Sequence, residues 1–301
     1  MLPWPNLRSG AAFPYPVEVI TERLPVRRVR FEYPDDLDPA WNHRFPEFAY
    51  GANSVSLLMP FAEPYFVKSV RGALPQLDES MRPRVEDFLR QELEHNVQHR
   101  RFNLLLTRRY PRLVWLERRI RATYAWFGRT RSLRYNLAFA AGSETIAYAL
   151  ARWSEDHLSE FFDDADPVAA TLYLWHLAEE VEHKTVAFDV YDAVDGSRWR
   201  YLLAMVTSFS LLALFCTIGV LTMMAKDRRI WNPVAWFRLL RWSVSLAFEV
   251  LPDMAVSAMP SHHPSDFTDP VWLATSLRYF DPETATMPLW EHDPREQPGA
   301  A

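Results

Sequence analysis

The chain has 301 residues, 49% of them hydrophobic and 24% charged, which is the composition of a globular protein and excludes a disordered one. Its net charge of −5 gives no reason to expect a nucleic-acid partner. The one cysteine, Cys216, excludes an intramolecular disulfide and a cysteine-ligated metal cluster. Few glycines and long periodic runs favour an all-α fold, with many of the prolines in loops and tails.

Residues 1–44 are rich in proline and lack helical periodicity, so they predict an extended arm. Within the arm, residues 26–33 alternate between apolar and polar side chains, and a short strand or an extended segment both fit. The N-terminal residues lack the apolar run of a signal peptide. This favours a cytoplasmic protein.

The first two predicted helices span about 45–74 and 79–108. The first is almost entirely apolar around Glu63, and a carboxylate in that setting is costly unless a cation accompanies it. On the second, Glu92, His95 and His99 are separated by three and then four residues, which places them on one helical face. The two helices therefore offer one lone glutamate and one Glu-x-x-His pair.

The same combination recurs downstream. A basic amphipathic segment, 112–127, predicts a crossover helix, and the next helix, about 130–156, carries Glu144 among small residues. A fourth helix is predicted over 166–194, with an aspartate cap followed by proline at its start. Its His176, Glu180 and His183 lie at offsets of zero, four and seven, so they also share one face.

Two repeats of "Glu, then Glu-x-x-His" make up the ligand set of a ferritin-like four-helix bundle that binds two metal ions. Carboxylates and imidazoles favour iron, then manganese, over zinc. His99 and His176 are candidates for additional ligands or for partners that hold the ligands. Glu94, Glu179 and Glu182 lie beside the stripes and are expected to be solvated or bound to arginines. The predicted metal ligands are Glu63, Glu92, His95, Glu144, Glu180 and His183.

An uncharged segment, 201–225, follows the bundle and is long enough to cross a hydrocarbon core of ~30 Å. Cations flank both of its ends, and a second, amphipathic segment from Asn232-Pro233 carries Trp and Arg suited to a membrane interface. We expect membrane contact, either as a span or as an in-plane hairpin, although a buried fifth helix is the alternative. In the tail, nothing in the sequence places His262 or His263 at the metal site.

The predicted organisation has four parts. These are an arm over 1–44, a di-metal bundle over 45–196, an added apolar helical hairpin over 197–258 and a tail over 259–301.

The motifs resemble those of a known bacterial family, the predicted metal-dependent hydrolases. The resemblance covers roughly residues 20–265. It implies a ferritin-like helical domain with the six ligands named above, and a hydrolytic activity. The residues that carry it are Phe61-Ala-Glu63-Pro-Tyr-Phe66, Gln91-Glu92-x-x-His95-x-x-x-His99, Glu144 and Glu180-x-x-His183.

Three functions fit these features. The first is a di-iron enzyme, at or in the inner face of the membrane, that uses O2 to hydroxylate or desaturate a hydrophobic substrate. The second is the metal-dependent hydrolysis of an ester or phosphoester that the family resemblance implies. The third is non-catalytic metal binding. The sequence leaves open the substrate, the electron donor and whether the chain forms a homodimer.

Overall fold

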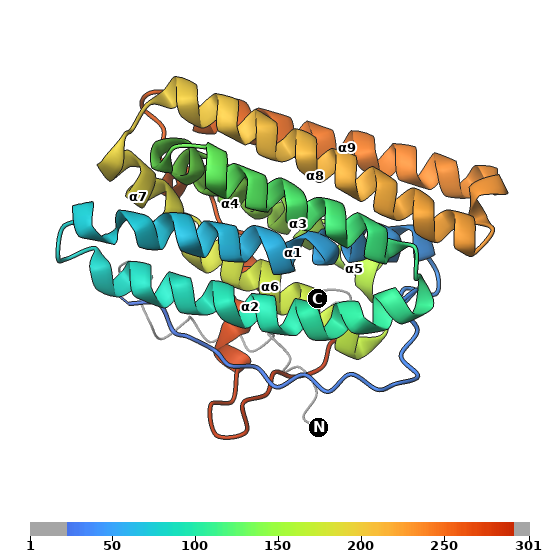
Figure 1. The fold of residues 1–301 in the computed structure, drawn as a ribbon. Helices are drawn as coiled ribbons and strands as arrows, with labels where there is room; N and C mark the ends of the chain where they lie inside the picture. The colour runs from blue at the N-terminus through green and yellow to red at the C-terminus, as the bar shows by residue number, and fades with distance from the viewer. Residues whose placement is uncertain (1–22, 292–301) are drawn as a thin grey trace.

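The computed structural model describes residues 23–291 and is all-α over that range. Figure 1 shows long helices lying side by side along one direction. The main helices are α1 (Pro46–Ala73), α2 (Arg82–Arg109), α3 (Leu113–Thr130), α4 (Leu133–Glu155), α6 (Pro167–His183), α8 (Arg198–Lys226) and α9 (Pro233–Ser257). Shorter ones are α5 (Leu158–Phe162), α7 (Val186–Val194) and α10 (Val271–Ser276). Short 3-10 turns are η1 (Leu74–Gln76), η2 (Arg229–Trp231), η3 (Pro264–Asp266) and η4 (Leu277–Tyr279).

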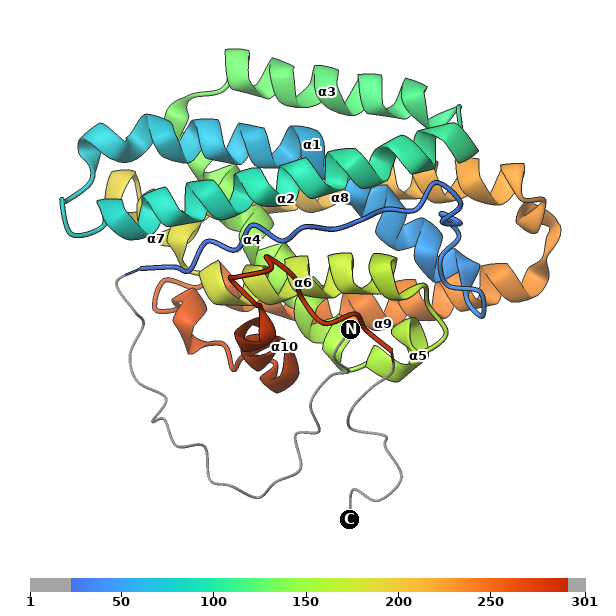
Figure 2. The ribbon, with the colours of Figure 1, turned by 90° about the horizontal axis from the view of Figure 1, so that it is seen from below.

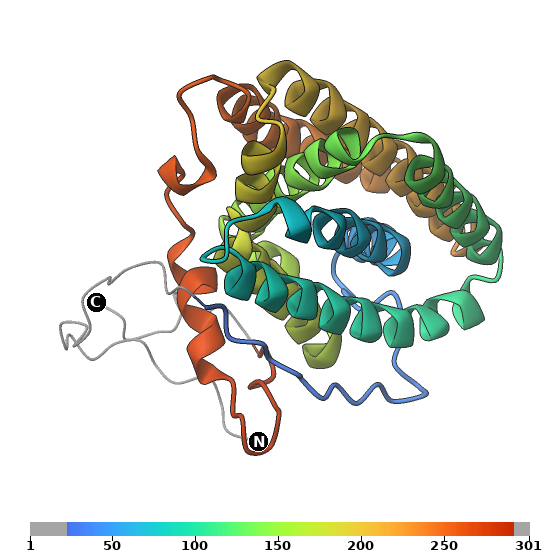
Figure 3. The same cartoon turned by 60° about the vertical axis from the view of Figure 1, so that its left-hand side comes forward.

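Helices α1, α2, α4 and α6 carry all of the predicted ligands, and α1 lies in the middle of the bundle (Figure 3). The predicted crossover helix is present as α3, which connects α2 to α4. The side chain of Ser132 accepts a hydrogen bond from Tyr135 N at the start of α4. Asp166 accepts from the first amide groups of α6, with Pro167 at its first position, as the sequence predicts. These caps fix where two of the four ligand-bearing helices begin.

The predicted fourth helix is wrong in one respect, because it is not continuous from 166 to 194. It ends at His183 as α6, and the chain turns before α7 begins at Val186. Side chains and backbone from elsewhere bind the turn residues: Lys184 Nζ donates to Phe267 O over 3.1 Å, and Arg84 Nη2 donates to Thr185 Oγ1 over 2.9 Å. These tertiary contacts stabilise a break that the local apolar pattern does not reveal.

Residues 24–33 of the predicted arm cross α2 and α6 as an extended segment, not as a strand (Figure 2). Leu24, Val29 and Phe31 are buried. Backbone groups of the segment bond to α2, since Gln98 Nε2 donates to Val29 O and Leu24 N donates to Asp87 Oδ2. The arm prediction for residues 1–22 lies outside the described residues, as does the tail prediction for 292–301.

The predicted apolar hairpin is formed by α8 and α9, which lie along α4 and α1 (Figure 1). A Cβ on Gly142 of α4 would come within 2.6 Å of Met205 Cβ, and one on Gly219 of α8 within 2.4 Å of Ser54 Oγ. Glycine therefore permits two close approaches of α8 to the bundle. Helix α8 is long and apolar enough to cross a membrane, although only 28% of its most apolar window is buried inside the protein.

Candidate metal centre

The six residues predicted as metal ligands meet in the middle of the bundle. None of the six is more than 4% exposed. Burial of four carboxylates in one place is unusual, because each costs free energy unless it is paired with a cation or a hydrogen-bond donor. The residues are Glu63 from α1, Glu92 and His95 from α2, Glu144 from α4, and Glu180 and His183 from α6.

Their ligand atoms form two adjacent groups. In each group one atom from every residue lies within 4.8 Å of one atom from every other, a spacing that a single metal ion can span. The first group contains four of the predicted ligands. The second contains two of them together with His176, whose part as a ligand was open in the sequence. The groups are Glu92, Glu144, Glu180 and His183, and then Glu63, His95 and His176.

Glu180 lies between the two groups. Its Oε2 is 3.3 Å from His183 Nε2 in the first group, while its Oε1 is 2.8 Å from His176 Nε2 in the second. Glu92 is similarly placed, since its Oε1 is 3.4 Å from His183 Nε2 and 3.8 Å from His95 Nδ1. Two carboxylates therefore reach both groups, as bridging ligands do in a dinuclear carboxylate site.

Seven side-chain atoms of the six predicted ligands are buried and lack a hydrogen-bond partner. Buried polar atoms are normally satisfied, so a cluster of this size indicates that something other than protein is meant to contact it. Every one of these atoms is an oxygen or an unsubstituted imidazole nitrogen, the donors that divalent first-row metals bind. They are Glu63 Oε1 and Oε2, Glu92 Oε1, His95 Nδ1, Glu144 Oε2, Glu180 Oε2 and His183 Nε2.

The other ring nitrogens of His95 and His183 are held by hydrogen bonds. His95 Nε2 lies 2.9 Å from Glu179 Oε2, and Glu179 Oε1 in turn accepts from Arg27 Nη1 over 3.1 Å. His183 Nδ1 lies 3.1 Å from Gln91 Oε1, and Gln91 is oriented because its Nε2 donates to Pro25 O. With the proton on the held nitrogen, the free lone pair of each ring points to the centre, as metal-binding histidines require.

A chain of hydrogen bonds orients His176 in the same way. Asn103 Nδ2 donates to Ser56 O, which leaves Asn103 Oδ1 to accept the Ser56 hydroxyl proton over 2.7 Å. Ser56 Oγ must then accept from His99 Nδ1, 2.8 Å away, so His99 Nε2 carries a lone pair. That nitrogen lies 2.5 Å from His176 Nδ1 and accepts its proton. The lone pair of His176 Nε2 is left facing the centre, where Glu180 Oε1 lies 2.8 Å and Glu63 Oε1 3.8 Å away.

The two histidines left open by the sequence therefore differ. His176 belongs to the second group of ligand atoms, and His99 lies one residue further out and contacts His176. Burial, and then the neighbouring His176, lowers the pKa of His99 well below its ordinary value. A neutral His99 is what the hydrogen-bond chain requires.

Burial and the neighbouring carboxylates raise the pKa values of three of the four glutamates, Glu63, Glu92 and Glu144. Burial, followed by Glu180 and Glu144, raises the pKa of Glu63 well above its ordinary value, and burial raises the pKa of Glu144 to about 7. Burial would raise the pKa of Glu180 and lower that of His183, but their mutual attraction outweighs it and moves both values the other way. Four carboxylates at this spacing cannot all stay ionised without added positive charge, so the donor set fits divalent cations.

Residues 25–267 match one protein family, described as "Predicted metal-dependent hydrolase". The chain belongs to this family. No curated protein and no solved structure matches the chain. The matched range contains all six predicted ligands and His176, so the whole centre lies inside the part of the chain that identifies the family. The resemblance predicted from the motifs is confirmed.

Three residues around the centre have roles that the sequence does not reveal: their side chains hold the histidines in place. Glu179 was expected to be solvated or bound to an arginine; it does bind Arg27, but it is fully buried and also contacts His95. Gln91 and Ser56 hold the remote nitrogens of His183 and His99. A glutamine next to Glu92 was visible in the sequence, but no local pattern shows which helix it faces.

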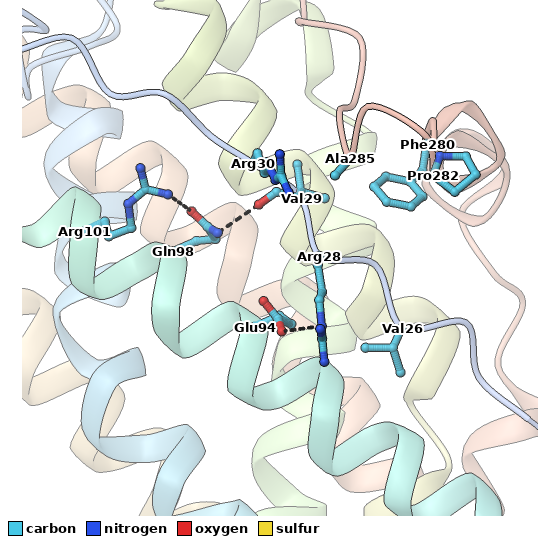
Figure 4. Close-up of a pocket in the computed structure, with 10 residues that line it drawn as sticks. All are labelled: Val26, Arg28, Val29, Arg30, Glu94, Gln98, Arg101, Phe280, Pro282 and Ala285. Carbon is cyan, nitrogen blue, oxygen red and sulfur yellow. Dashed lines mark hydrogen bonds and ion pairs between the residues drawn. The ribbon is translucent and has the colours of Figure 1, made fainter.

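The two histidines of the tail lie elsewhere. His263 Nε2 is 2.7 Å from Asp189 Oδ1 on α7, and His262 Nδ1 is 3.5 Å from Asp266 Oδ2. A surface cavity of about 450 Å³ between the arm, α2 and residues 280–285 also lies outside the centre (Figure 4). Two of its arginines have partners, because Arg28 pairs with Glu94 and Arg101 Nη1 donates to Gln98 Oε1.

Proposed function

We propose that this protein is a metal-dependent hydrolase with two divalent ions held side by side in the bundle. The observation that carries the proposal is the set of seven buried, unpartnered ligand atoms that converge in two groups bridged by Glu180. The family to which the chain belongs favours hydrolysis over other metal-dependent chemistry. Held this way, the ions would supply Lewis acidity that polarises an ester or phosphoester oxygen and activates water.

The protein's own residues have three tasks in this function. Glu180 and Glu92 would each help to hold both ions, because each lies within 4 Å of histidine nitrogens in both groups. Glu179, Gln91 and His99 fix the tautomers of the three ligand histidines. Aromatic rings limit the movement of the imidazoles and exclude water, since Phe88 packs on His183 at 4.9 Å and Trp175 on His95 at 5.0 Å.

Elemental analysis and turnover together test this proposal. We expect about two divalent ions per chain, and metal-dependent cleavage of p-nitrophenyl esters or phosphoesters under argon as well as in air. Chelation should abolish turnover and added metal should restore it. Ions bound without cleavage of any ester or phosphoester in the panel would favour metal binding alone.

A second candidate function is O2-dependent oxidation of a hydrophobic substrate by a di-iron centre. The observation that favours it is the donor set itself, four glutamates and three histidines from four helices, which suits iron or manganese better than zinc. The chemistry supplied by reduced iron would be activation of O2. The electron donor is unassigned.

Anaerobic loading with Fe(II), followed by exposure to O2, separates the two candidates. Oxidation predicts a near-ultraviolet charge-transfer band that develops only after O2 is added, and a product that forms only in air. Hydrolysis predicts equal rates with and without O2, and activity with redox-inert Zn(II) as well as with iron.

A further inference from the structure

The outer face of the α8–α9 hairpin is largely apolar, and the exposed Arg241 on α9 pairs with Glu160. Of the large hydrophobic side chains that the described residues expose, two thirds come from this one segment. Phe248 is 77% exposed and Phe237 is 66% exposed, and a large exposed apolar surface marks a site of contact with a protein partner or a membrane. The hairpin face consists of Trp199, Leu203, Val206, Leu214, Trp231, Val234, Trp236, Phe237, Leu240, Val244, Phe248, Leu251, Val256 and Met259.

Both ends of the hairpin carry tryptophan and cations. Helices α8 and α9 are antiparallel, and Tyr201 near the start of α8 hydrogen-bonds to Ser257 at the end of α9. Trp199 lies beside Arg198 at this end. At the other end, exposed Trp231 and Trp236 follow the exposed cations Lys226 and Arg228. Tryptophan and basic residues at the two edges of an apolar surface are typical of a membrane interface.

Helix α3, which packs beside α8, carries a set of exposed arginines that form a positive rim. A Cβ on Gly219 of α8 would lie 3.5 Å from Leu116 of α3, so the two helices are in contact, and Figure 3 shows them as neighbours. Helix α3 and its two ends expose arginines along their whole length, while its one acidic residue, Glu117, is half-buried. These arginines are Arg112, Arg118, Arg119, Arg121, Arg129 and Arg131. A positive rim of this kind complements anionic lipid headgroups.

The tertiary structure decides how a bilayer could meet this surface. If α8 crossed the membrane, α3, which packs against it, and α2, which runs along the same direction on the far side of the bundle, would have to cross with it (Figure 1). Exposed arginines at the middle of these helices, such as Arg119 on α3 and Arg100 on α2, would then lie in hydrocarbon, which is strongly unfavourable. With the hairpin lying flat, only its apolar face enters the bilayer.

We infer that this protein docks on an anionic bilayer through the outer face of the α8–α9 hairpin, with both helices parallel to the membrane plane. A bilayer accounts for the apolar face, the tryptophans at both ends and the arginine rim together. A second copy of the chain would cover the apolar face but would leave the arginine rim without a partner of opposite charge. The membrane is therefore the one occupant that all three features fit.

This docking brings the metal centre within one helix layer of the lipid. The inner side of α8 contacts α4 through Met205 against Gly142 and through a 2.7 Å hydrogen bond between Ser208 and Ser143. Glu144 is the next residue of α4 after Ser143. An apolar substrate dissolved in the bilayer would thus have the shortest approach through the side of the bundle that the hairpin covers. The docking itself stands on the surface and does not depend on the reaction.

Vesicle flotation with the full chain tests the docking. We expect binding to vesicles of 70% phosphatidylcholine and 30% phosphatidylglycerol, and weaker binding to phosphatidylcholine alone. Phe237→Glu combined with Phe248→Glu should reduce binding by at least about tenfold. Leu104→Glu is the matched control, because Leu104 is 60% exposed on α2, on the other side of the bundle. Equal binding by both variants, or a dimer in solution with no vesicle binding, overturns the inference.

A labelling experiment separates a flat hairpin from a span. Single cysteines are placed near the two ends of α8, as Ala193→Cys in the last turn of α7, shortly before α8 begins, and Lys226→Cys at the last residue of α8, in a Cys216→Ser background. Both positions are exposed, and a membrane-impermeant maleimide added outside intact vesicles should label both to the same extent. Protection of one end with labelling of the other would mean that α8 crosses the bilayer, and the inference would be wrong. Equal far-ultraviolet circular dichroism shows that the variants are folded.

Discussion

The metal centre and the hairpin face reverse the usual distribution of polarity in a globular protein. The centre buries four carboxylates and three imidazoles where a bundle normally packs leucine and valine. The hairpin face exposes phenylalanine and tryptophan where a surface normally carries lysine and glutamate. Each region would be unfavourable in an isolated protein in water. Each becomes favourable when a second component is added, a cation in one case and an apolar phase in the other.

The two regions should also differ in how well they tolerate substitutions. Centre atoms have fixed distances and partners on four helices, so one altered side chain affects several others. Side chains on the hairpin face have few protein contacts on their outer side, so a change there should alter what the protein binds and not how it folds. The predictions below test that difference.

The largest effect is expected at Glu180. Glu180→Ala removes the carboxylate that reaches both ligand groups and should take metal content from about two ions per chain to less than one. Stabilisation by metal, about 4 kcal/mol when metal is present at a thousand times its dissociation constant, should be lost as well. Plasma mass spectrometry and thermal unfolding with and without chelator measure the two effects. Glu94→Ala is the control, since Glu94 pairs with Arg28 outside the centre; equal metal loss in both variants would contradict the assignment.

The hydrogen-bond chain behind His176 should have the next largest effect. His99→Leu removes the group that fixes the His176 tautomer, and metal affinity should fall about 10- to 100-fold, as when such supporting residues are lost elsewhere. Competition with a fluorescent chelator measures the affinity. His157→Leu replaces a histidine that bonds only to Trp153 O and packs on aromatic rings, and it should leave affinity unchanged. An unaltered affinity in His99→Leu would show that His176 does not depend on this chain.

The third largest effect is expected where α8 of the hairpin contacts α4 of the metal centre, at Gly142 and Met205. In Gly142→Ala the new Cβ would lie 2.6 Å from Met205 Cβ, too close for α8 to keep its position on α4. Overpacking of this kind costs about 1–3 kcal/mol of unfolding free energy. In Gly51→Ala, a helical glycine with nothing within 4 Å, stability should stay equal or rise. Urea unfolding distinguishes the two, and equal destabilisation would mean that α8 has room to move.

A smaller effect, on the unfolding free energy, is expected where the arm crosses α2. Hydrogen bonds from Arg23 lower the pKa of Asp87 and outweigh burial, which alone would raise it. Leu24 N also donates to this carboxylate. A lowered folded-state pKa adds stability above the unfolded value of about 3.9, and that stability disappears as pH falls through the folded value. The stability difference between the native chain and Asp87→Asn should be about 1 kcal/mol or less at pH 7 and should disappear as the pH falls through the lowered folded-state pKa. A difference that grows in acid would reverse the sign and exclude this role.

The smallest effect is expected on the hairpin face. Phe237→Ser and Phe248→Ser should change the unfolding free energy by no more than about 0.5 kcal/mol and should leave metal content unaltered. Urea unfolding in the absence of lipid and mass spectrometry measure both quantities. A loss as large as that of Gly142→Ala would show that this face is part of the folding core, and the contrast between the two regions would disappear.

The sequence by itself predicted six of the seven residues in the two candidate ligand groups, and the helices that carry them. Glu92 and His95, and Glu180 and His183, are three residues apart, and helical geometry alone puts each pair on one face. Glu63 was identifiable because its neighbours are apolar. The hairpin was equally visible, because a long uncharged run needs no tertiary information to be recognised. Such local periodicities also predict an all-α chain.

Only the tertiary structure decided which side chains meet across helices. The interhelical contact of His95 with Glu179, the position of His176 in the second group and that of His99 behind it depend on the rotation and spacing of α2 and α6. The break after His183 and the flat orientation inferred for α8 have the same origin. Sequence spacing determines which residues share a helical face, whereas contacts between helices depend on how those faces pack, and no single helix carries that information.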